Sequence, residues 1–166
     1  LEKVRRSRQA DIIAVGHTAD DQVEEVLLRL IRGSGLKGLS GMRPKNGRLI
    51  RPLLEVSRQE ILAYLDSKEH EFCHDSSNES DRFLRNRIRM ELLPLLEKRF
   101  NPSIRTTILN TAKILEIEDD LLTIESDRLF GSIVEISESD GSGGQRNLTI
   151  STERLAGCHS ALRRRI

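Results

Sequence analysis

The chain has 166 residues, of which 37% are hydrophobic, 32% charged and 3% aromatic, so it holds enough apolar material for a folded core, and a wholly disordered chain is excluded. The 27 basic and 26 acidic residues give a net charge of +1, which excludes a histone-like polycation. Two cysteines are too few for a disulfide framework, and no long apolar run suggests a membrane span or a leader, so we expect a soluble, cytoplasmic protein.

The first recognisable elements are a strand and a helix. Residues 12–15 form a short apolar run, which predicts a buried strand behind the tail of a helix. Thr18 with Asp21 three residues later resembles a helix cap, and apolar residues then recur at helical spacing up to residue 31. We therefore expect a strand, a tight turn and a helix in this order.

The next segment continues the alternation. Its glycines, proline and asparagine make residues 33–48 a loop region, and residues 49–50 are a candidate short strand. Ser57 and Glu60 form a capping box, which predicts the start of a second helix. Alternating strands and helices favour a parallel α/β layer over an all-helical bundle.

After residue 81 the pattern becomes mainly helical. One apolar stripe runs through residues 84–96, where we expect Pro94 to kink or break the helix. Asn101 and Pro102 are typical of the cap and first turn of another helix. This change of pattern indicates a second, mainly helical part of the chain.

Two β-prone runs follow within the helical part. They are residues 132–136 and 147–151, and the stretch between them has the composition of a hairpin turn or a linker. We place the domain boundary between residues 1–99 and 100–166.

Acidic side chains gather where the first predicted strand gives way to its helix. Asp20, Asp21, Glu24 and Glu25 follow His17, at the carboxyl end of a strand, where open α/β sheets bind their ligands. Such crowding persists most naturally where Mg²⁺ or a substrate ammonium group neutralises it. The alternative is that acids in a first turn simply complement the helix dipole.

A second polar cluster lies about sixty residues later. Arg85 and Arg89 are four residues apart on one helical face, with Asn86 between them, and Asp75 and Asn78 precede them. A guanidinium group donates two parallel hydrogen bonds to phosphate or carboxylate. We expect an anionic partner here, the alternative being a solvated helix face.

The glycine-rich residues 32–39 allow two interpretations. They could hold phosphate, because glycines permit close backbone approach and Arg32 and Lys37 supply positive charge. They could also be a helix C-terminal cap and a loop, because they follow a predicted helix instead of preceding one. Spacing alone favours the cap.

A series of short motifs runs in order along residues 10–130. The motifs are G-H-T-A-D-D-Q-V-E at 16–24, L-L-R-L-I-R-G-S-G at 27–35, G-L at 38–39, R-P-L-L at 51–54, S-R-x-E at 57–60, D-S-S-N at 75–78 and R-N-R-I-R at 85–89. In this order they resemble the tRNA(Ile)-lysidine synthetase family of the N-type ATP pyrophosphatase superfamily.

This resemblance implies both a fold and a reaction. The fold is α/β: a truncated parallel-sheet, nucleotide-binding domain of the HUP or Rossmann-like (adenine nucleotide alpha hydrolase-like) type, followed by a mainly helical tRNA-binding domain. The reaction is that of a bacterial, cytoplasmic carbon–nitrogen ligase. With ATP and Mg²⁺ it adenylates the wobble cytidine of tRNA(Ile), and the side-chain amine of L-lysine then displaces AMP.

The resemblance also implies roles for individual residues. The catalytic residues are Asp21, Glu24 and Arg89. The residues that bind substrate or tRNA are Asp20, Asp75, Asn78, Arg85 and Asn86. Asp20 and Asp21 are also assigned to Mg²⁺.

Two departures from the family pattern stand out. The Ser-Gly-Gly-x-Asp-Ser loop that grips ATP does not occur in these 166 residues, and Glu25 stands where a threonine is usual. We therefore expect a fragment that is inactive alone. Two alternatives remain, a non-catalytic tRNA-binding module and a related tRNA thiolase, for which Cys73 and Cys158 lack the usual pairing. The oligomeric state stays open, with a homodimer as one option.

Overall fold

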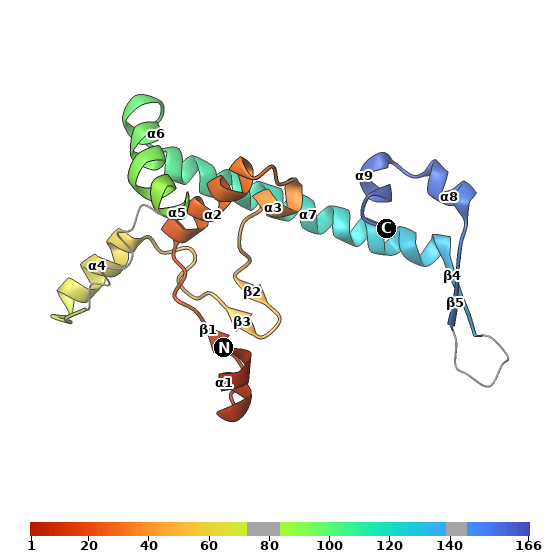
Figure 1. Cartoon of the computed structure of the whole chain (residues 1–166), viewed down its shortest axis with the longest axis horizontal. Helices are drawn as coiled ribbons and strands as arrows, with labels where there is room; N and C mark the ends of the chain where they lie inside the picture. The colour runs from red at the N-terminus through yellow and green to blue at the C-terminus, as the bar shows by residue number, and fades with distance from the viewer. Residues whose placement is uncertain (73–83, 139–145) are drawn as a thin grey trace. The chain divides into compact units, whose positions relative to one another are not determined.

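The computed structural model describes residues 1–72, 84–138 and 146–166. The chain divides into two compact units, Leu1–Glu116 and Ile117–Ile166. Helix α7 (Ile104–Ile133) contributes to both units (Figure 1). The predicted boundary after residue 99 separates a catalytic domain from a tRNA-binding domain. The division into compact units does not test that functional assignment.

The first unit combines short strands with helices. In chain order it contains α1 (Glu2–Ser7), β1 (Ile13–Ala14), α2 (Ala19–Ile31), α3 (Leu36–Leu39), β2 (Lys45–Asn46), β3 (Leu49–Ile50), α4 (Arg58–Ser67), α5 (Leu84–Arg87), the π-helical turn η2 (Ile88–Leu92), α6 (Leu93–Arg99) and the start of α7.

The sheet of the first unit has the strand order β1-β3-β2. β1 pairs with β3 in parallel, with Ile13 opposite Leu49, which agrees with the expected parallel layer. β2 pairs with β3 antiparallel. The predicted burial of the first strand is wrong, since Ile12 is 51% exposed and Ala14 is also exposed. In the described residues β1 has a neighbour on one side only, and strands of two residues bury little surface.

Helix α2 begins as the sequence predicts. The Thr18 hydroxyl accepts a hydrogen bond from the Asp21 backbone N–H, and the Asp21 side chain accepts one from the Thr18 backbone N–H, which completes a capping box. The apolar face of the helix places Val23 and Leu27 in a buried cluster with Ile88 and Leu93. Burial of such side chains stabilises the fold by about 1.5–3 kcal/mol each. The cluster therefore fixes α2 against the helical segment that follows residue 83.

Helix α4 confirms the second capping box, formed by Ser57 and Glu60. The region between α2 and β3 is more ordered than the loop predicted for residues 33–48. It contains the single helical turn α3 and the edge strand β2. Neither element could be predicted in this glycine-rich segment, because a four-residue helix and a two-residue strand are too short to leave a periodic pattern.

The helical segment α5–η2–α6 continues through Pro94 instead of breaking there. A proline ring crowds the carbonyl group four residues earlier, which belongs to Met90, and removes one backbone donor. Met90 lies inside the π-helical turn η2, directly before α6. The wider turn accommodates the proline, so the predicted disruption takes the form of a local π-helix.

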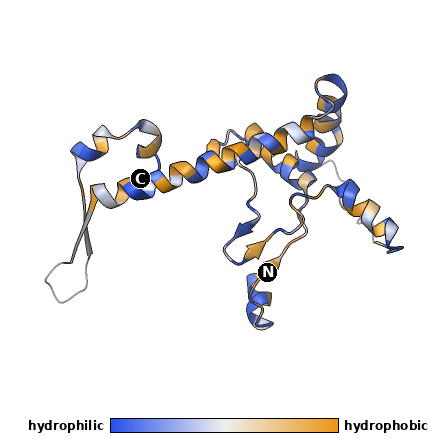
Figure 2. Ribbon diagram, turned by 180° about the vertical axis from the view of Figure 1, so that it is seen from behind, coloured by the Kyte–Doolittle hydropathy of each residue, from blue (hydrophilic) through white to orange (hydrophobic). Residues whose placement is uncertain are grey.

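Helix α7 starts two residues later than the sequence suggests. The Asn101 side chain accepts a hydrogen bond from the Ser103 backbone N–H at 2.9 Å, as a cap would, and the helix begins at Ile104. Apolar and polar residues are interspersed along α7 (Figure 2). Across the described ranges, no helix combines the length and the apolar character needed to span a membrane.

The second unit contains the rest of α7 and four short elements. These are β4 (Val134–Glu138), β5 (Arg146–Ile150), α8 (Thr152–Gly157) and α9 (Ser160–Arg163). β4 and β5 pair antiparallel, with Val134 opposite Ile150, which confirms the predicted β-prone runs. The buried carboxylate of Asp119 forms an ion pair with Arg165 and so ties the end of the unit to α7.

Candidate active site

The first predicted acidic cluster and the predicted arginine pair meet in one place. Glu24 of α2 is fully buried, with 0% of its surface exposed. Its carboxylate accepts hydrogen bonds from Arg85 Nε at 2.9 Å and from Arg89 Nε and Nη2 at 2.6 and 3.0 Å. Burying a carboxylate is costly unless it is paired. The two arginines therefore make it possible for Glu24 to lie in the core face of α2.

Asp21 joins the helix cap to this ion-paired group. Its Oδ2 atom accepts hydrogen bonds from the backbone N–H and hydroxyl of Thr18, at 2.8 and 3.0 Å. Its Oδ1 atom lies 3.1 Å from Arg85 Nη2 and 3.8 Å from Arg89 Nη2. One carboxylate thus orients the start of α2 and faces both guanidinium groups.

Asp20 is held from a different side. Its Oδ2 atom accepts a hydrogen bond from the Arg58 backbone N–H at 2.7 Å, and its Oδ1 atom accepts one from Arg105 Nη1 at 2.9 Å. Arg105 Nε also donates to Glu97 at 2.6 Å. Arg105 and Glu97 were not among the site residues predicted from the sequence. The one available signal was a cation in the first turn of α7, where the helix dipole disfavours positive charge.

These charged groups line a cavity of about 470 Å³. Its charged lining contains the three carboxylates together with Arg89, Arg58 and Arg105. The rest of the described lining is mostly apolar and comes from residues that precede the arginine motif in the sequence. The apolar residues are Ile61, Leu62, Leu65 and Phe72. A ligand in this cavity would meet both charged and apolar surface.

The electrostatics of the cluster differ from the expectation. The hydrogen bond that Arg89 donates to the Glu24 carboxylate raises the pKa of Arg89 above its usual value, so this guanidinium stays charged at every working pH. Repulsion among the acids is relieved inside the chain by the arginines that the sequence assigned to an external anion. The cluster is therefore a preformed ion-pair network.

The Mg²⁺ assignment gains no support from this arrangement. The carboxylates of Asp20 and Asp21 already accept N–H or O–H donors on both oxygens. In the parts of the chain that the structure describes, no group of three His, Cys, Asp or Glu side chains could hold a metal ion. The assignment stays a prediction.

The remaining predicted site residues are not among the described residues that line the cavity. Asn86 is half-buried in α5 and is not part of the described cavity lining. Asp75 and Asn78 lie outside the described residues. The Nδ1 atom of His17 accepts a hydrogen bond from Arg51 Nε at 3.1 Å, which links the turn after β1 to the end of β3.

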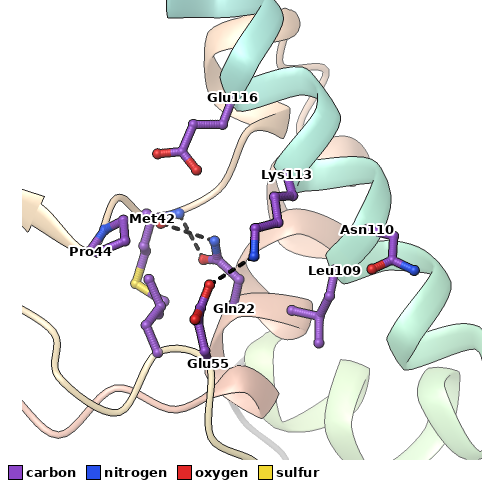
Figure 3. Close-up of a pocket in the computed structure, with 9 residues that line it drawn as sticks. Gln22, Met42, Pro44, Glu55, Leu109, Asn110, Lys113 and Glu116 are labelled. Carbon is purple, nitrogen blue, oxygen red and sulfur yellow. Dashed lines mark hydrogen bonds and ion pairs between the residues drawn. The ribbon is translucent and has the colours of Figure 1, made fainter.

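A smaller hollow of about 300 Å³ lies between α2, α7 and the turn that follows β3 (Figure 3). The buried Gln22 side-chain amide donates a hydrogen bond to the Met42 carbonyl oxygen at 2.9 Å and accepts one from the Met42 backbone N–H at 2.7 Å. Across the opening, Lys113 Nζ lies 2.9 Å from Glu55 Oε1. These contacts link α2 to the segment after Gly41, and α7 to the turn after β3.

Comparisons with known proteins fit this geometry. The model of the PP-loop domain family matches residues 1–96. The tRNA(Ile)-lysidine synthase of Bacteroides thetaiotaomicron is 44% identical over 124 residues, and that of Parabacteroides distasonis 47% identical over 121 residues. These matches cover 75% and 73% of this chain but only 28% and 27% of the relatives, so the chain spans little more than a quarter of their length.

One solved structure gives an independent comparison. It is the U34-tRNA thiolase NcsA from Methanococcus maripaludis with its [4Fe-4S] cluster. It has a TM-score of 0.51 and 25% identity, and the match covers 70% of this chain and 40% of that chain. Together the comparisons confirm the predicted fold class and the resemblance on which it depended.

Proposed function

The chain belongs to the PP-loop domain family, and from this premise we propose that the protein containing it is a tRNA(Ile)-lysidine synthase. Such an enzyme is a carbon–nitrogen ligase that uses ATP to join L-lysine to the wobble cytidine of tRNA(Ile). The names of the relatives support this activity. The observation that carries it is the buried Glu24 carboxylate held between Arg85 and Arg89 on the wall of a cavity.

The two kinds of charge suit the leaving group and the nucleophile of the lysine-transfer step. Negative charge develops on the leaving group when lysine displaces AMP, and a fixed guanidinium group such as Arg89 stabilises it. The lysine ammonium group must lose a proton before its nitrogen can attack. Asp21 lines the cavity and keeps 22% of its side chain exposed. In this proposal it exchanges one of its present hydrogen bonds for the ammonium group and accepts the proton.

Glu24 has a different part in this proposal. Its carboxylate is ion-paired with both arginines and so fixes their positions, and of the two Arg89 lines the cavity. Asp20, held by Arg105, adds a second carboxylate for the ammonium group. The apolar wall of α4 suits the methylene chain of lysine or the face of a nucleobase.

ATP supplies the AMP group that lysine displaces, and the PP-loop family membership supports its use. Mg²⁺ is predicted to accompany ATP, but Asp20 and Asp21 in their present contacts do not form a site for it. No step is therefore assigned to the metal.

The domain assignment and the location belong to the same proposal. Residues 1–99 would form the C-terminal part of the catalytic domain, and residues 100–166 would begin a helical tRNA-binding domain. The family match to residues 1–96 supports the first of these. The protein would act in the cytoplasm, where its tRNA substrate is found.

A tRNA thiolase is the rival that the structural comparison brings forward. Iron–sulfur clusters are held mainly by cysteine thiolates, commonly four. This chain has two cysteines, Cys73 and Cys158, separated by more than eighty residues. The cysteine count within this chain therefore favours lysine ligation over sulfur transfer.

Lysine incorporation tests the proposal. The complete gene product that contains this chain is incubated with ATP, radiolabelled lysine and tRNA(Ile) carrying either cytidine or uridine at the wobble position. We expect lysine to be attached only to the cytidine form, with one AMP released per lysine. The absence of incorporation, incorporation without ATP, or sulfur transfer to the uridine form would refute the proposal.

A further inference from the structure

A third concave surface lies beside the C-terminal part of α2, away from the acidic cluster. It is a hollow of about 500 Å³, which we call the basic hollow. Its charged lining consists of Arg29, Lys37, Arg43 and Arg51. The glycine-rich segment, for which the sequence allowed two interpretations, forms much of the remaining wall.

Two glycines in the wall of this hollow are required by close packing. Gly41 has φ +74°, and a Cβ atom there would lie 2.6 Å from the Gln22 side-chain nitrogen. A Cβ atom on Gly38 would lie 2.5 Å from Ser34 Cβ. The chain therefore folds back tightly after α2, and a larger residue at either position would disturb this wall.

The charge of the hollow is one-sided. Arg29 is a structural member, since its Nε donates to Glu25 at 2.6 Å and its Nη1 donates to the carbonyl groups of Gly38 and Gly41 at 2.9 and 3.0 Å. Lys37 is exposed. Among the described residues that line the hollow there are four cations and no carboxylate.

This composition fits phosphate oxygens. Guanidinium and ammonium groups bind phosphate through charge-assisted hydrogen bonds, which are among the strongest in proteins. A nucleotide site would also need apolar or aromatic surface for its base. Met42 is the one apolar side chain in the described lining, so the hollow suits a phosphate backbone better than a free nucleotide.

Position relates the hollow to the candidate active site. Arg29 and Glu24 lie on the same helix, five residues apart, which corresponds to a rise of about 7.5 Å. At about 3.4 Å of rise per nucleotide in a stacked strand, a few nucleotides are enough to reach from one place to the other. We propose that the basic hollow binds the phosphodiester backbone of the tRNA beside the reacting nucleotide. This inference rests on the proposed function, because it takes the reacting nucleotide to lie in the cavity at Glu24.

The test measures tRNA affinity as a function of salt with the complete protein. The variants are Lys37→Ala and Arg43→Ala. The matched control is Arg32→Ala, which removes an exposed cation of the same segment that is outside the hollow. Each lost phosphate contact should weaken binding about fivefold at about 0.15 M salt and reduce the slope of log K against log salt by about 0.7–0.9.

The outcomes separate this inference from the proposed function. Weaker tRNA binding with a smaller salt slope in both hollow variants, but not in Arg32→Ala, with an unchanged KM for ATP, supports the basic hollow as a backbone site. Variants that bind tRNA like the wild type while the wild type transfers lysine would overturn the inference alone. A raised KM for ATP without a change in tRNA affinity would assign the hollow to nucleotide phosphates and would overturn it as well. An unchanged thermal unfolding midpoint in the alanine variants excludes misfolding as the cause. The variant Lys37→Arg keeps the positive charge and should retain the wild-type affinity for tRNA.

Discussion

Replacing Glu24 with glutamine removes the negative charge on which the ion-pair network converges. Glutamine keeps the shape but offers an amide N–H₂ group to arginine donors, so at least one contact becomes repulsive. Breaking a buried ion pair costs about 3–5 kcal/mol. Because the side chains of Arg85 and Arg89 are 36% and 29% exposed, water solvates part of the released charge. We therefore expect a loss of about 2–3 kcal/mol in the free energy of unfolding.

Urea unfolding followed by circular dichroism measures this loss, and amide exchange in α2 locates it. Glu25→Gln is the matched control, because it makes the same change one residue later, in a helical ion pair with Arg29. Such (i, i+4) pairs contribute about 0.3–0.5 kcal/mol. Equal losses in the two variants would refute the reasoning that Glu24 is held as a buried, paired charge.

Three further predictions concern the surroundings of the site. Arg105→Ala should slow lysine transfer about 10- to 100-fold, because Asp20 loses the contact that positions it. Hydrogen bonds from the Ser57 hydroxyl, and to a lesser extent from its backbone N–H, lower the pKa of Glu60. The stability that ionised Glu60 adds to α4 is therefore present above pH 4.5 and is lost as pH falls through the lowered pKa. In an NMR titration, Ser57→Ala should return that pKa toward 4.5. Gly41→Ala should destabilise the fold by about 1–3 kcal/mol in urea unfolding, because it combines a positive φ with a steric clash.

Each of these predictions has its own control. Arg99→Ala removes an exposed cation near the end of α6 and should leave lysine transfer unchanged; a loss equal to that of Arg105→Ala would contradict positioning of Asp20. An unchanged pKa of Glu60 in Ser57→Ala would contradict the capping account. Gly47 has φ +60°, and a Cβ atom added there would meet nothing within 4 Å, so Gly47→Ala isolates backbone strain, and an equal loss there would exclude the clash at Gly41.

Local signals predicted the local structure well. The two capping boxes, opened by Thr18 and Ser57, start helices at the expected residues. These signals succeed because a cap needs only a side chain and a backbone N–H three residues away. The predicted β-prone runs around residues 134 and 150 also pair as strands.

Long-range contacts could not be obtained in this way. The spacing of Arg85 and Arg89 indicated an anion, but no local pattern identifies that anion as Glu24, more than sixty residues earlier. Arg105 was missed for the same reason, since its contact with Asp20 spans 85 residues. The strand at residues 13–14 was expected to be buried because its residues are apolar, but burial depends on neighbouring elements that hydropathy does not specify.

The most direct test of the central claim is a double-mutant cycle between Glu24 and Arg89 in lysine transfer to tRNA(Ile), measured as kcat/KM of the complete protein. If both side chains act as one unit at the reacting centre, Glu24→Ala and Arg89→Ala should each lower the rate by at least about 100-fold, and the double variant should lose little more than either alone. Losses that multiply to about 10,000-fold in the double variant, or single variants that keep full activity, would contradict the claim.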